Sequence, residues 1–506
     1  MSITARLLDR LADTRLAADE RARLRVRLSR EHLDSGDYDA ALEALDALWP
    51  QLGARPRLEG LGAAARAELL LHAGVLTGFV GSHRRVDGAQ EQAKNLISEA
   101  LNAFEEMGDR ERVAEARAEL AYCYWREGAF DEARVLLEEA LRGLGQSETE
   151  ARALALVRLA IVERSAGRFR EALRAHQGSA AFFERLQSHS LKGRFHVGLA
   201  ETYRHLAESE ARGDYTDRAF IEYEAAAFHF SAAGHERYRA AVENNIACLL
   251  LFVGRHAQAH EHLDRARSIF DALGDGVRAA QTDETRARVL LAEGRLEEAE
   301  RTARAAARAL EHCDEAALFA DALMTLGTVL ARHGRREEAR TLLSSAEEAA
   351  LRAGAPEAAG RAALAAAEEL GDEMLPREFG ALFERAAERL AGSQQPGVRD
   401  RLNACALRFV KARAPVLDMP WRAARDGGAW DGFSLRREVL RYEAELIEKA
   451  LRDAGGSVSR AAKLLGFRHH QTFVALLNNR HRELLHARNP IAPRKGKSSA
   501  HRRRRA

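Results

Sequence analysis

The sequence predicts an all-α protein, in which a long α-solenoid of helical hairpins precedes a small helical domain. Alanine, leucine, arginine and glutamate dominate the 506 residues, whereas proline is limited to 9 and aromatic residues to 6%. This balance favours helix and gives strands little support. A chain of this length also exceeds the roughly 250 to 300 residues at which a single core stops growing. A third observation, a regular spacing of glycines, points to repeats.

The repeat is visible when the loop glycines are aligned. Each aligned glycine has an alanine five residues later and another small residue seven residues earlier. The glycines are Gly36, Gly88, Gly128, Gly167, Gly254, Gly294 and Gly334. The pattern predicts two antiparallel helices per unit, joined by a short turn at the glycine, which readily adopts the positive φ that helix ends often need. The small residues let the two helices approach closely.

Adjacent units are spaced 40, 39, 40 and 40 residues apart. The longer interval between Gly167 and Gly254 holds one irregular unit that we expect to turn at Gly213, with its alanine, Ala219, six residues later. Apolar residues recur at helical spacing in the second helix of the unit that turns at Gly128, as a packed helix requires. They are Phe130, Ala133, Leu136, Leu137, Ala140 and Leu141.

The segment Leu120 to Ala133 resembles the tetratricopeptide repeat in its Leu120, Ala121, Tyr124, Gly128 and Ala133. The resemblance covers roughly residues 20 to 370, and a further helical stretch to about Arg413 resembles a terminal cap, so we assign residues 1–413 to the array. The period is nearer 40 than 34 residues, and the proline that often ends such a repeat is absent.

An array of this kind offers a face for a protein or peptide partner. The resemblance implies that Asn244 and Asn245, on the first helix of their unit, hold the backbone of that partner. The alternative is that both are solvated asparagines. His256, His260 and His262 suggest a metal site, but no carboxylate or cysteine pattern accompanies them, and solvated helix surface accounts for them better. No metal and no cofactor is expected.

Residues 414–433 have the composition of a linker, with prolines, glycines and two tryptophans, Trp421 and Trp430. A long helix follows and stops at Gly455 and Gly456, and Ser457 or Ser459 can cap the next helix. The long helix carries apolar residues on one face, namely Val439, Leu440, Leu446, Ile447, Ala450 and Leu451.

The following segment has an alanine, Ala462, four residues before a glycine, Gly466. This spacing is typical of a helix-turn-helix, since the alanine lets two helices touch and the glycine permits a sharp turn. Residues 435 to 482 are similar to the Fis-type DNA-binding domain, and we assign residues 434–488 to it. One extra residue in the turn is needed to bring Phe473 and Leu477 onto the core positions of the family. The basic residues usual at the centre of the second helix are replaced by Val474, Ala475 and Leu476.

The resemblance implies that the second helix enters the major groove of double-stranded DNA. The residues predicted to reach base edges are His470, Gln471, Thr472, Asn478, Asn479 and Arg480. Those predicted to contact phosphates are Arg460, Lys463, Arg468 and Arg482. Fis-type domains pair through their long helix, so the resemblance implies a homodimer on DNA, formed through Val439, Leu446 and Ile447. The alternative is that these residues pack against the repeats.

The charge distribution agrees with a nucleic-acid partner. From Ser434 to the end there are 18 basic and 6 acidic residues, a net charge of +12, whereas the rest of the chain carries −10. The basic tail at 489–506 is expected to be disordered and to add affinity for phosphates without specificity. The alternative is a scaffold or adaptor protein whose basic end binds RNA or an acidic protein.

Other function classes find no support in the sequence. No phosphate-binding loop and no metalloprotease, hydrolase or dinucleotide-binding motif occurs, so we do not expect an enzyme. The four cysteines lack metal-site spacing and are expected to be reduced and buried. We find no signal peptide and no apolar run of membrane-spanning length, and therefore expect a cytoplasmic protein.

Overall fold

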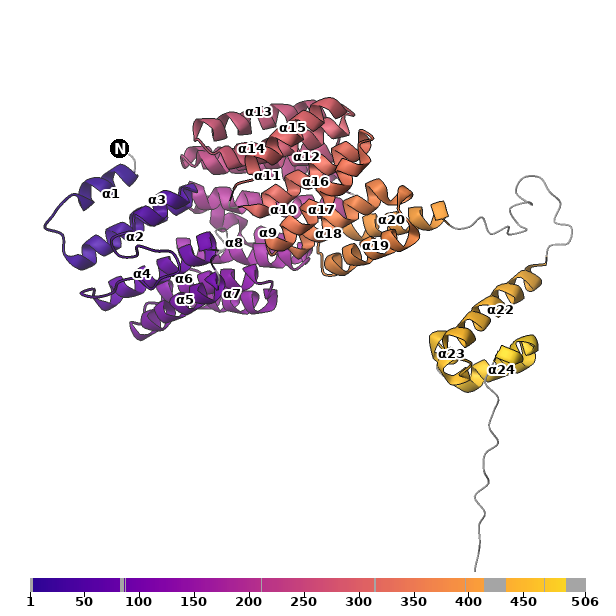
Figure 1. Cartoon of the computed structure of the whole chain (residues 1–506). Helices are drawn as coiled ribbons and strands as arrows, with labels where there is room; N and C mark the ends of the chain where they lie inside the picture. The colour runs from indigo at the N-terminus through magenta and orange to yellow at the C-terminus, as the bar shows by residue number, and fades with distance from the viewer. Residues whose placement is uncertain are drawn as a thin grey trace, which may run out of the picture. The chain divides into compact units, whose positions relative to one another are not determined.

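A computed structural model describes residues 3–81, 86, 88–210, 212–313, 315–395, 397–413, 434–467 and 469–487. The regular elements of these residues are all helical. The chain divides into two compact units, residues 1–413 and 414–506, which we describe separately. Figure 1 shows the helices of both. The predicted all-α class, a solenoid followed by a small helical domain, is confirmed.

The first unit is a succession of antiparallel helical hairpins after a short N-terminal helix, α1 (Ile3–Leu11). The hairpins are α2 (Ala18–Ser35) with α3 (Tyr38–Glu43), α4 (Ala63–Leu76) with α5 (Ala89–Glu106), α6 (Arg110–Arg126) with α7 (Phe130–Leu144), α8 (Glu150–Ser165) with α9 (Phe169–Arg185), α10 (His189–Glu210) with α11 (Gly213–Ala232), α12 (Glu236–Phe252) with α13 (His256–Ala272), α14 (Gly276–Ala292) with α15 (Leu296–Leu310), α16 (Ala316–Arg332) with α17 (Arg336–Arg352), and α18 (Pro356–Leu370) with α19 (Pro376–Leu390). A π-helical segment (Thr77–Gly81) extends α4, a short 3-10 helix (Gly371–Glu373) follows α18, and α20 (Val398–Arg413) ends the unit.

The turns inside the hairpins have the geometry that the glycine pattern predicts. All seven aligned glycines have positive φ, from 69° at Gly88 to 83° at Gly334. At Gly128 this conformation lets the N–H of Ala129 donate to the carbonyl of Tyr124 at 3.0 Å, which satisfies a carbonyl at the end of α6. The irregular unit is also a hairpin. Its first helix, α10, has 22 residues against 17 in α12, and Gly213 begins α11.

The predicted close approach of the two helices is confirmed. The alanine five residues after each aligned glycine is completely buried in all seven hairpins. The small residue seven before the glycine lies against the partner helix. A β-carbon added at Gly327 of α16 would lie only 2.7 Å from Cγ of Leu343 on α17. The small side chains therefore set the distance between the helices.

We predict that Gly327→Ala destabilises the array, although alanine is the better helix former. Helix propensity favours the substitution by up to about 1 kcal/mol, but forcing an extra methyl into a packed interface costs roughly 1 to 3 kcal/mol. The matched control is Gly178→Ala in α9, where a β-carbon meets nothing within 4 Å. Denaturant unfolding should show a loss of stability for the first variant and a gain for the second. A gain in both would mean that the interface can relax around the methyl group.

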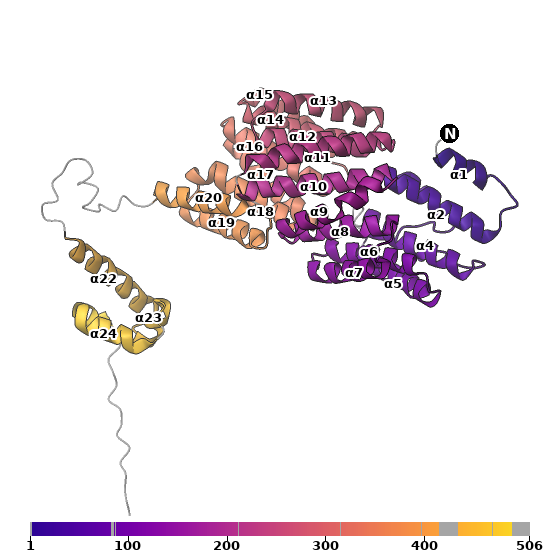
Figure 2. The same ribbon diagram turned by 180° about the vertical axis from the view of Figure 1, so that it is seen from behind.

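The array also makes contacts between repeats that are far apart in the sequence. Arg194 of α10 pairs with Asp34 of α2, 160 residues earlier, with Nη2 and Oδ1 2.7 Å apart. Arg237 of α12 lies against Gly36, at the turn that ends α2. The first hairpin therefore packs against the fifth and the sixth, and the succession of repeats returns to its own beginning (Figure 2).

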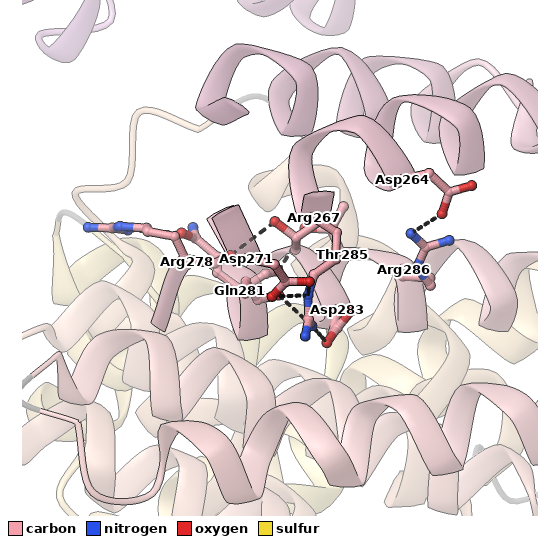
Figure 3. A network of polar contacts seen from close by, with 10 residues as sticks. Asp264, Arg267, Asp271, Arg278, Gln281, Asp283, Thr285 and Arg286 are labelled. Carbon is pink, nitrogen blue, oxygen red and sulfur yellow. Dashed lines mark hydrogen bonds and ion pairs between the residues drawn. The ribbon is translucent and has the colours of Figure 1, made fainter. Parts of the chain in front are cut away.

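Ion pairs join neighbouring repeats. Figure 3 shows the junction of α13 with α14, where Arg267 of α13 reaches Asp271 on its own helix at 3.0 Å and Asp283 on the next. Arg286 of α14 pairs in return with Asp264 of α13 at 2.7 Å. Because each pair is partly exposed to water, these contacts contribute to the register of the repeats more than to their stability.

The histidines of α13 differ from the sequence prediction. His262 is not solvated. It is buried, and its Nδ1 lies 2.8 Å from Oε2 of Glu243 on α12. His260 lies 3.2 Å from Glu293 of the next repeat. A histidine on the inner face of its helix can exchange solvent for a carboxylate partner, and the spacing of the histidines alone does not reveal this. Within the described residues, no group of three or more His, Cys, Asp or Glu side chains is arranged to hold a metal ion.

The cysteines are free, but only Cys123 and Cys405 are buried, whereas Cys248 and Cys313 are partly exposed. The prediction that all four are buried was therefore wrong for two of them. Burial raises the pKa of the Cys123 thiol to about 12, so this side chain stays protonated and packs as a small apolar group.

One helix of the array has the length and composition of a membrane span, contrary to the sequence expectation. It comprises α4 with its π-helical extension, Ala63–Gly81, and has a mean hydropathy of 1.3. About 67% of this segment is buried inside the array, where its apolar side chains belong to the core between α2, α5 and α6. The core helix of a packed array has the same composition, which explains the resemblance.

Candidate nucleic-acid interface

The described part of the second unit contains α22 (Leu435–Asp453), α23 (Val458–Leu464), α24 (His470–Arg480) and a short 3-10 helix, η3 (Arg482–Ala487). Ser434 caps α22, since its Oγ accepts a hydrogen bond from the N–H of Arg437 at 3.4 Å. The helices enclose a small core of their own, built from Ile447, Ala450, Leu451, Ala454, Ala461, Ala462, Phe473, Leu477 and Leu484. We call residues 434–487 the C-terminal module.

The turn between α23 and α24 is a helix-turn-helix turn. Gly466 has a φ of 76°, and the N–H of Phe467 donates to the carbonyl of Ala462 at 2.9 Å. Ala462 is almost completely buried, which lets the two helices meet. Phe473 and Leu477 are buried, as the longer turn predicts, and the rings of Phe467 and Phe473 lie 5.4 Å apart. Ser457 stands at the N-terminus of α23, although its side chain makes no capping hydrogen bond.

The predicted base-reading residues lie on the exposed side of α24. His470, Gln471, Thr472, Asn478 and Asn479 are all exposed. Gln471 and Asn478 are seven residues apart and therefore share one face of the helix, and Ala475 between them is exposed and small. Both amides therefore lie on the exposed face of α24, opposite Phe473 and Leu477 and two helical turns apart.

Arg480 and Arg482 are placed differently from the other predicted contacts. Nη1 of Arg480 lies 3.5 Å from Oε2 of Glu443 on α22, and Nε of Arg482 donates to the carbonyl of Asn478 at 2.6 Å. Both side chains are exposed, but each also holds the end of α24. Arg460 and Lys463 are exposed on α23. Arg468 lies outside the described residues.

The sequence reasoning missed His481, which fixes the end of α24. Its side chain is buried, and its Nε2 lies 3.1 Å from the same Glu443 carboxylate that faces Arg480. The two atoms make no hydrogen bond with each other, and both are buried. Phe473, Leu477 and His481 follow one another at four-residue intervals, and this spacing could have revealed the inward position of the histidine.

Most of the net positive charge of the C-terminal segment belongs to residues 488–506. Residues 434–487 contain ten basic and six acidic side chains, whereas residues 488–506 contain eight basic and no acidic ones. The module itself therefore carries only a modest net positive charge. The predicted disordered tail at 489–506 and the predicted linker at 414–433 lie outside the described residues.

The apolar face of α22 divides into a buried and an exposed part. Ile447 packs in the core of the module and is not available to a second chain, which corrects one of the predicted dimer contacts. Leu435, Val439, Tyr442 and Leu446 are large side chains that remain exposed. Their spacing of four, three and four residues places them on one stripe of the helix, as in a coiled-coil seam.

In the repeat array, Asn244 and Asn245 occupy different environments. Asn244 of α12 is only 9% exposed, and its Oδ1 has no hydrogen-bond partner. Asn245 is partly exposed. Of the two, Asn245 is the one that a partner could reach without moving a helix.

The C-terminal module matches a known family. Residues 440–468 match the family described as bacterial regulatory protein, Fis family. The match covers most of α22 and all of α23 and ends before α24, the helix in which the sequence departs from the family. The chain therefore carries a Fis-type helix-turn-helix at its C-terminus. No curated protein matches the sequence.

Several solved structures have a similar course of the chain. A Rap protein complexed with competence and sporulation factor is 16% identical with a TM-score of 0.46, over 69% of this chain and 100% of the other. A STAND protein with a tetratricopeptide repeat sensor from Pyrococcus horikoshii is 14% identical with a TM-score of 0.46, over 73% and 54%. Yeast Tom70 is 14% identical with a TM-score of 0.45, over 83% and 88%. Nothing about the partners of this chain follows from these likenesses.

Proposed function

We propose that this protein is a DNA-binding transcriptional regulator whose helical repeats bind a protein or peptide partner. The observation that carries the proposal is the exposed polar face of α24, set on a helix-turn-helix whose alanine, glycine and apolar residues all take the positions that the motif requires. The proposal includes separate folding of the array at 1–413 and the DNA-binding domain at 434–488, joined by a linker, and a cytoplasmic location. We assign no catalytic activity or cofactor to the chain, so regulation occurs by occupancy of a site or by recruitment.

Binding to genomic fragments tests the proposal. A regulator selects particular duplexes over bulk DNA, whereas a scaffold protein whose basic end binds RNA or an acidic protein does not. Gel-shift measurements of the full chain with a pool of genomic fragments, competed by bulk DNA and by RNA, distinguish the two. Retention of all duplexes alike, or preference for RNA, would favour the scaffold.

We predict that replacing Gln471 and Asn478 by alanine erodes sequence selectivity. Both amides can read adenine, and each lost base contact costs about 1 to 3 kcal/mol of discrimination. Arg460→Ala with Lys463→Ala is the contrasting pair, because phosphate contacts strengthen binding to all sequences alike. Titrations should show that the ratio of affinities for the preferred and a scrambled site falls when Gln471 and Asn478 are replaced. The ratio should not change when Arg460 and Lys463 are replaced. An unchanged ratio in the first pair would place the recognition surface elsewhere.

We also propose that the protein binds DNA as a homodimer through the exposed stripe of α22. Water contact with four large apolar side chains is unfavourable, and a second copy of the same helix covers them in a symmetric way. A two-fold dimer requires a roughly palindromic site with half-sites about one helical turn apart, or a multiple of it.

Tyr442→Glu combined with Leu446→Glu should therefore give one chain per site where the natural chain gives two. Sedimentation of the full chain with a duplex measures the ratio. Because both positions are exposed, the double variant should remain folded, and Glu448→Gln on the same helix serves as a control. A one-to-one complex of the natural chain on an asymmetric site would remove the dimer from the proposal.

The array is the regulatory part of the proposal. A partner bound to the repeats changes the affinity for DNA only if it binds one arrangement of the array and the C-terminal module more tightly than another. DNA must then change the affinity for the partner by the same factor. Asn244 and Asn245 are the residues proposed to hold the partner's backbone, and Asn245 is the more accessible of the two. The net charge of −10 outside the C-terminal segment favours a partner that carries a basic segment.

A further inference from the structure

The carboxylate of Glu443 on α22 faces two consecutive residues at the place where α24 ends. Nη1 of Arg480 lies 3.5 Å from Oε2 of Glu443, and Nε2 of His481 lies 3.1 Å from the same oxygen. The two neighbours differ in exposure, since the Arg480 side chain is 49% exposed and that of His481 is 1% exposed. Arg480 is therefore free to turn to DNA, whereas His481 faces the interior of the module.

The contact between Glu443 and His481 is incomplete. Oε2 of Glu443 and Nε2 of His481 are both buried, and neither has a hydrogen-bond partner. Buried polar atoms are almost always matched in folded proteins, and leaving one without a partner is costly. The two atoms lie 3.1 Å apart, within hydrogen-bond distance. A small turn of either side chain, or of the end of α24, makes the hydrogen bond, so the pair favours one orientation of α24 over those close to it.

Other polar groups around His481 do not replace this contact. Nδ1 of His481 lies 3.3 Å from Oε1 of Glu483, whose side chain is exposed to water. A protonated imidazole ring donates to both carboxylates and a neutral ring to one of them. Arg482 and His486 are bonded to backbone carbonyl oxygens. Among these groups, Glu443 is the one that belongs to α22 and links it to the end of α24.

A role in the core accounts for the burial of His481 but not for the carboxylate beside it. The ring continues the buried face that Phe473 and Leu477 form on α24, next to the buried Leu484 of η3. An apolar side chain at position 481 would serve that role equally well. It would not explain why α22 places a carboxylate oxygen against the ring, where it is shielded from water.

We propose that His481 is a positioning residue, which donates to Glu443 when Arg480 turns to DNA and so fixes the orientation in which α24 reads bases. Arg480 offsets part of the Glu443 charge in the free chain, and His481 is the donor that remains once Arg480 contacts a duplex. Gln471 and Asn478 lie on the exposed face of α24, so the orientation of this helix decides which base edges they reach. The inference rests on the proposed function and concerns selectivity among duplexes.

The test separates orientation from stability by means of variants of the full chain. His481→Gln keeps a donor close to the position of Nε2, and His481→Leu removes it. His481→Leu combined with Glu443→Met removes both partners. Replacing a whole buried polar pair by apolar residues is often neutral for stability, whereas removing one partner is costly. Glu445→Gln is the matched control, because Glu445 also lies on α22 and its carboxylate is exposed and faces Arg441 of the same helix.

Thermal unfolding followed by circular dichroism gives the stability of the module. Titrations with a duplex selected from genomic fragments and with its scrambled version give the ratio of affinities. His481→Leu alone should lower both quantities. In the double variant the stability should return, but the ratio should stay at least about ten-fold below that of the natural chain, as expected for one lost hydrogen bond to a charged group. His481→Gln should keep most of the ratio, and Glu445→Gln should keep all of it.

A double variant that folds and keeps the natural ratio overturns the inference and leaves the proposed function standing. A folded His481→Gln chain whose ratio falls as far as that of the double variant does the same, because the donor would then be irrelevant. If the double variant fails to fold, the pair serves the fold and not the reading orientation, which also overturns the inference. If the natural chain selects no duplex, the proposed function fails together with the inference.

Discussion

A chain shortened to end at residue 487 should bind every duplex roughly 10²- to 10³-fold more weakly at about 0.1 M salt, if about half of the removed cations contact phosphates. The deletion removes eight basic residues and no acidic one. Each phosphate that a basic residue neutralises releases counterions. The logarithm of the binding constant therefore falls linearly with the logarithm of the salt concentration, with a slope of about 0.9 per phosphate contact. In titrations between about 50 and 200 mM salt, this slope should be smaller by about four for the shortened chain than for the full chain.

The ratio of affinities for the preferred and a scrambled site should stay the same after this deletion, because phosphate contacts carry no sequence information. A chain in which residues 488–506 are replaced by an uncharged segment of equal length is the control for chain length. If the salt slope does not change, the tail does not contact DNA, and the modest charge of the module must supply the affinity.

Phe473→Ala should unfold the C-terminal module and abolish selective DNA binding. Phe473 is completely buried at the centre of the module's core. Truncating a buried phenylalanine costs about 3 to 5 kcal/mol, and a core of this size supplies about 3 to 5 kcal/mol in all. The array has a separate core and should keep its own unfolding transition.

Thermal unfolding followed by circular dichroism should show that the smaller transition is lost, and gel shift should show loss of site preference. Leu464→Ala is the control, since this leucine is 62% exposed at the end of α23 and its truncation should change stability by no more than about 0.5 kcal/mol. Selective binding by a Phe473→Ala chain would show that α24 is held in place by contacts outside this core.

The hairpins of the array could be predicted because their signal is local. A glycine with positive φ and an alanine at the helix contact lie five residues apart, so one short pattern specifies both the turn and the packing. The last hairpin lacks this pattern, because α18 ends in a 3-10 helix and Pro376 begins α19. The sequence accordingly predicted only a helical cap in that region.

The contact between the first hairpin and the fifth could not be predicted in this way. Asp34 and Arg194 are two charged residues among many, and nothing near either one in the sequence indicates the other. Periodic patterns specify elements and their neighbours, whereas sites between distant repeats depend on how far the array turns.

In the C-terminal module, the fold was easier to predict than the contacts of individual side chains. The burial of Phe473 and Leu477 followed from matching core positions with a longer turn. Ile447 was expected at a dimer contact but fills the core, since an apolar stripe on one helix cannot show which part of it a neighbouring helix covers.

The return of the first hairpin to the fifth and sixth alters how the array comes apart. In an open solenoid each repeat touches only its neighbours, so stability is a sum of local terms and the ends fray independently. Here the pair of Asp34 with Arg194 ties one end to the middle, and the loss of the first hairpin removes contacts from α10 and α12 as well. Unfolding should thus be more cooperative than in a solenoid whose repeats contact only their neighbours. Folding should be slower, because contacts between residues 160 positions apart in the sequence must form before the array is fully folded.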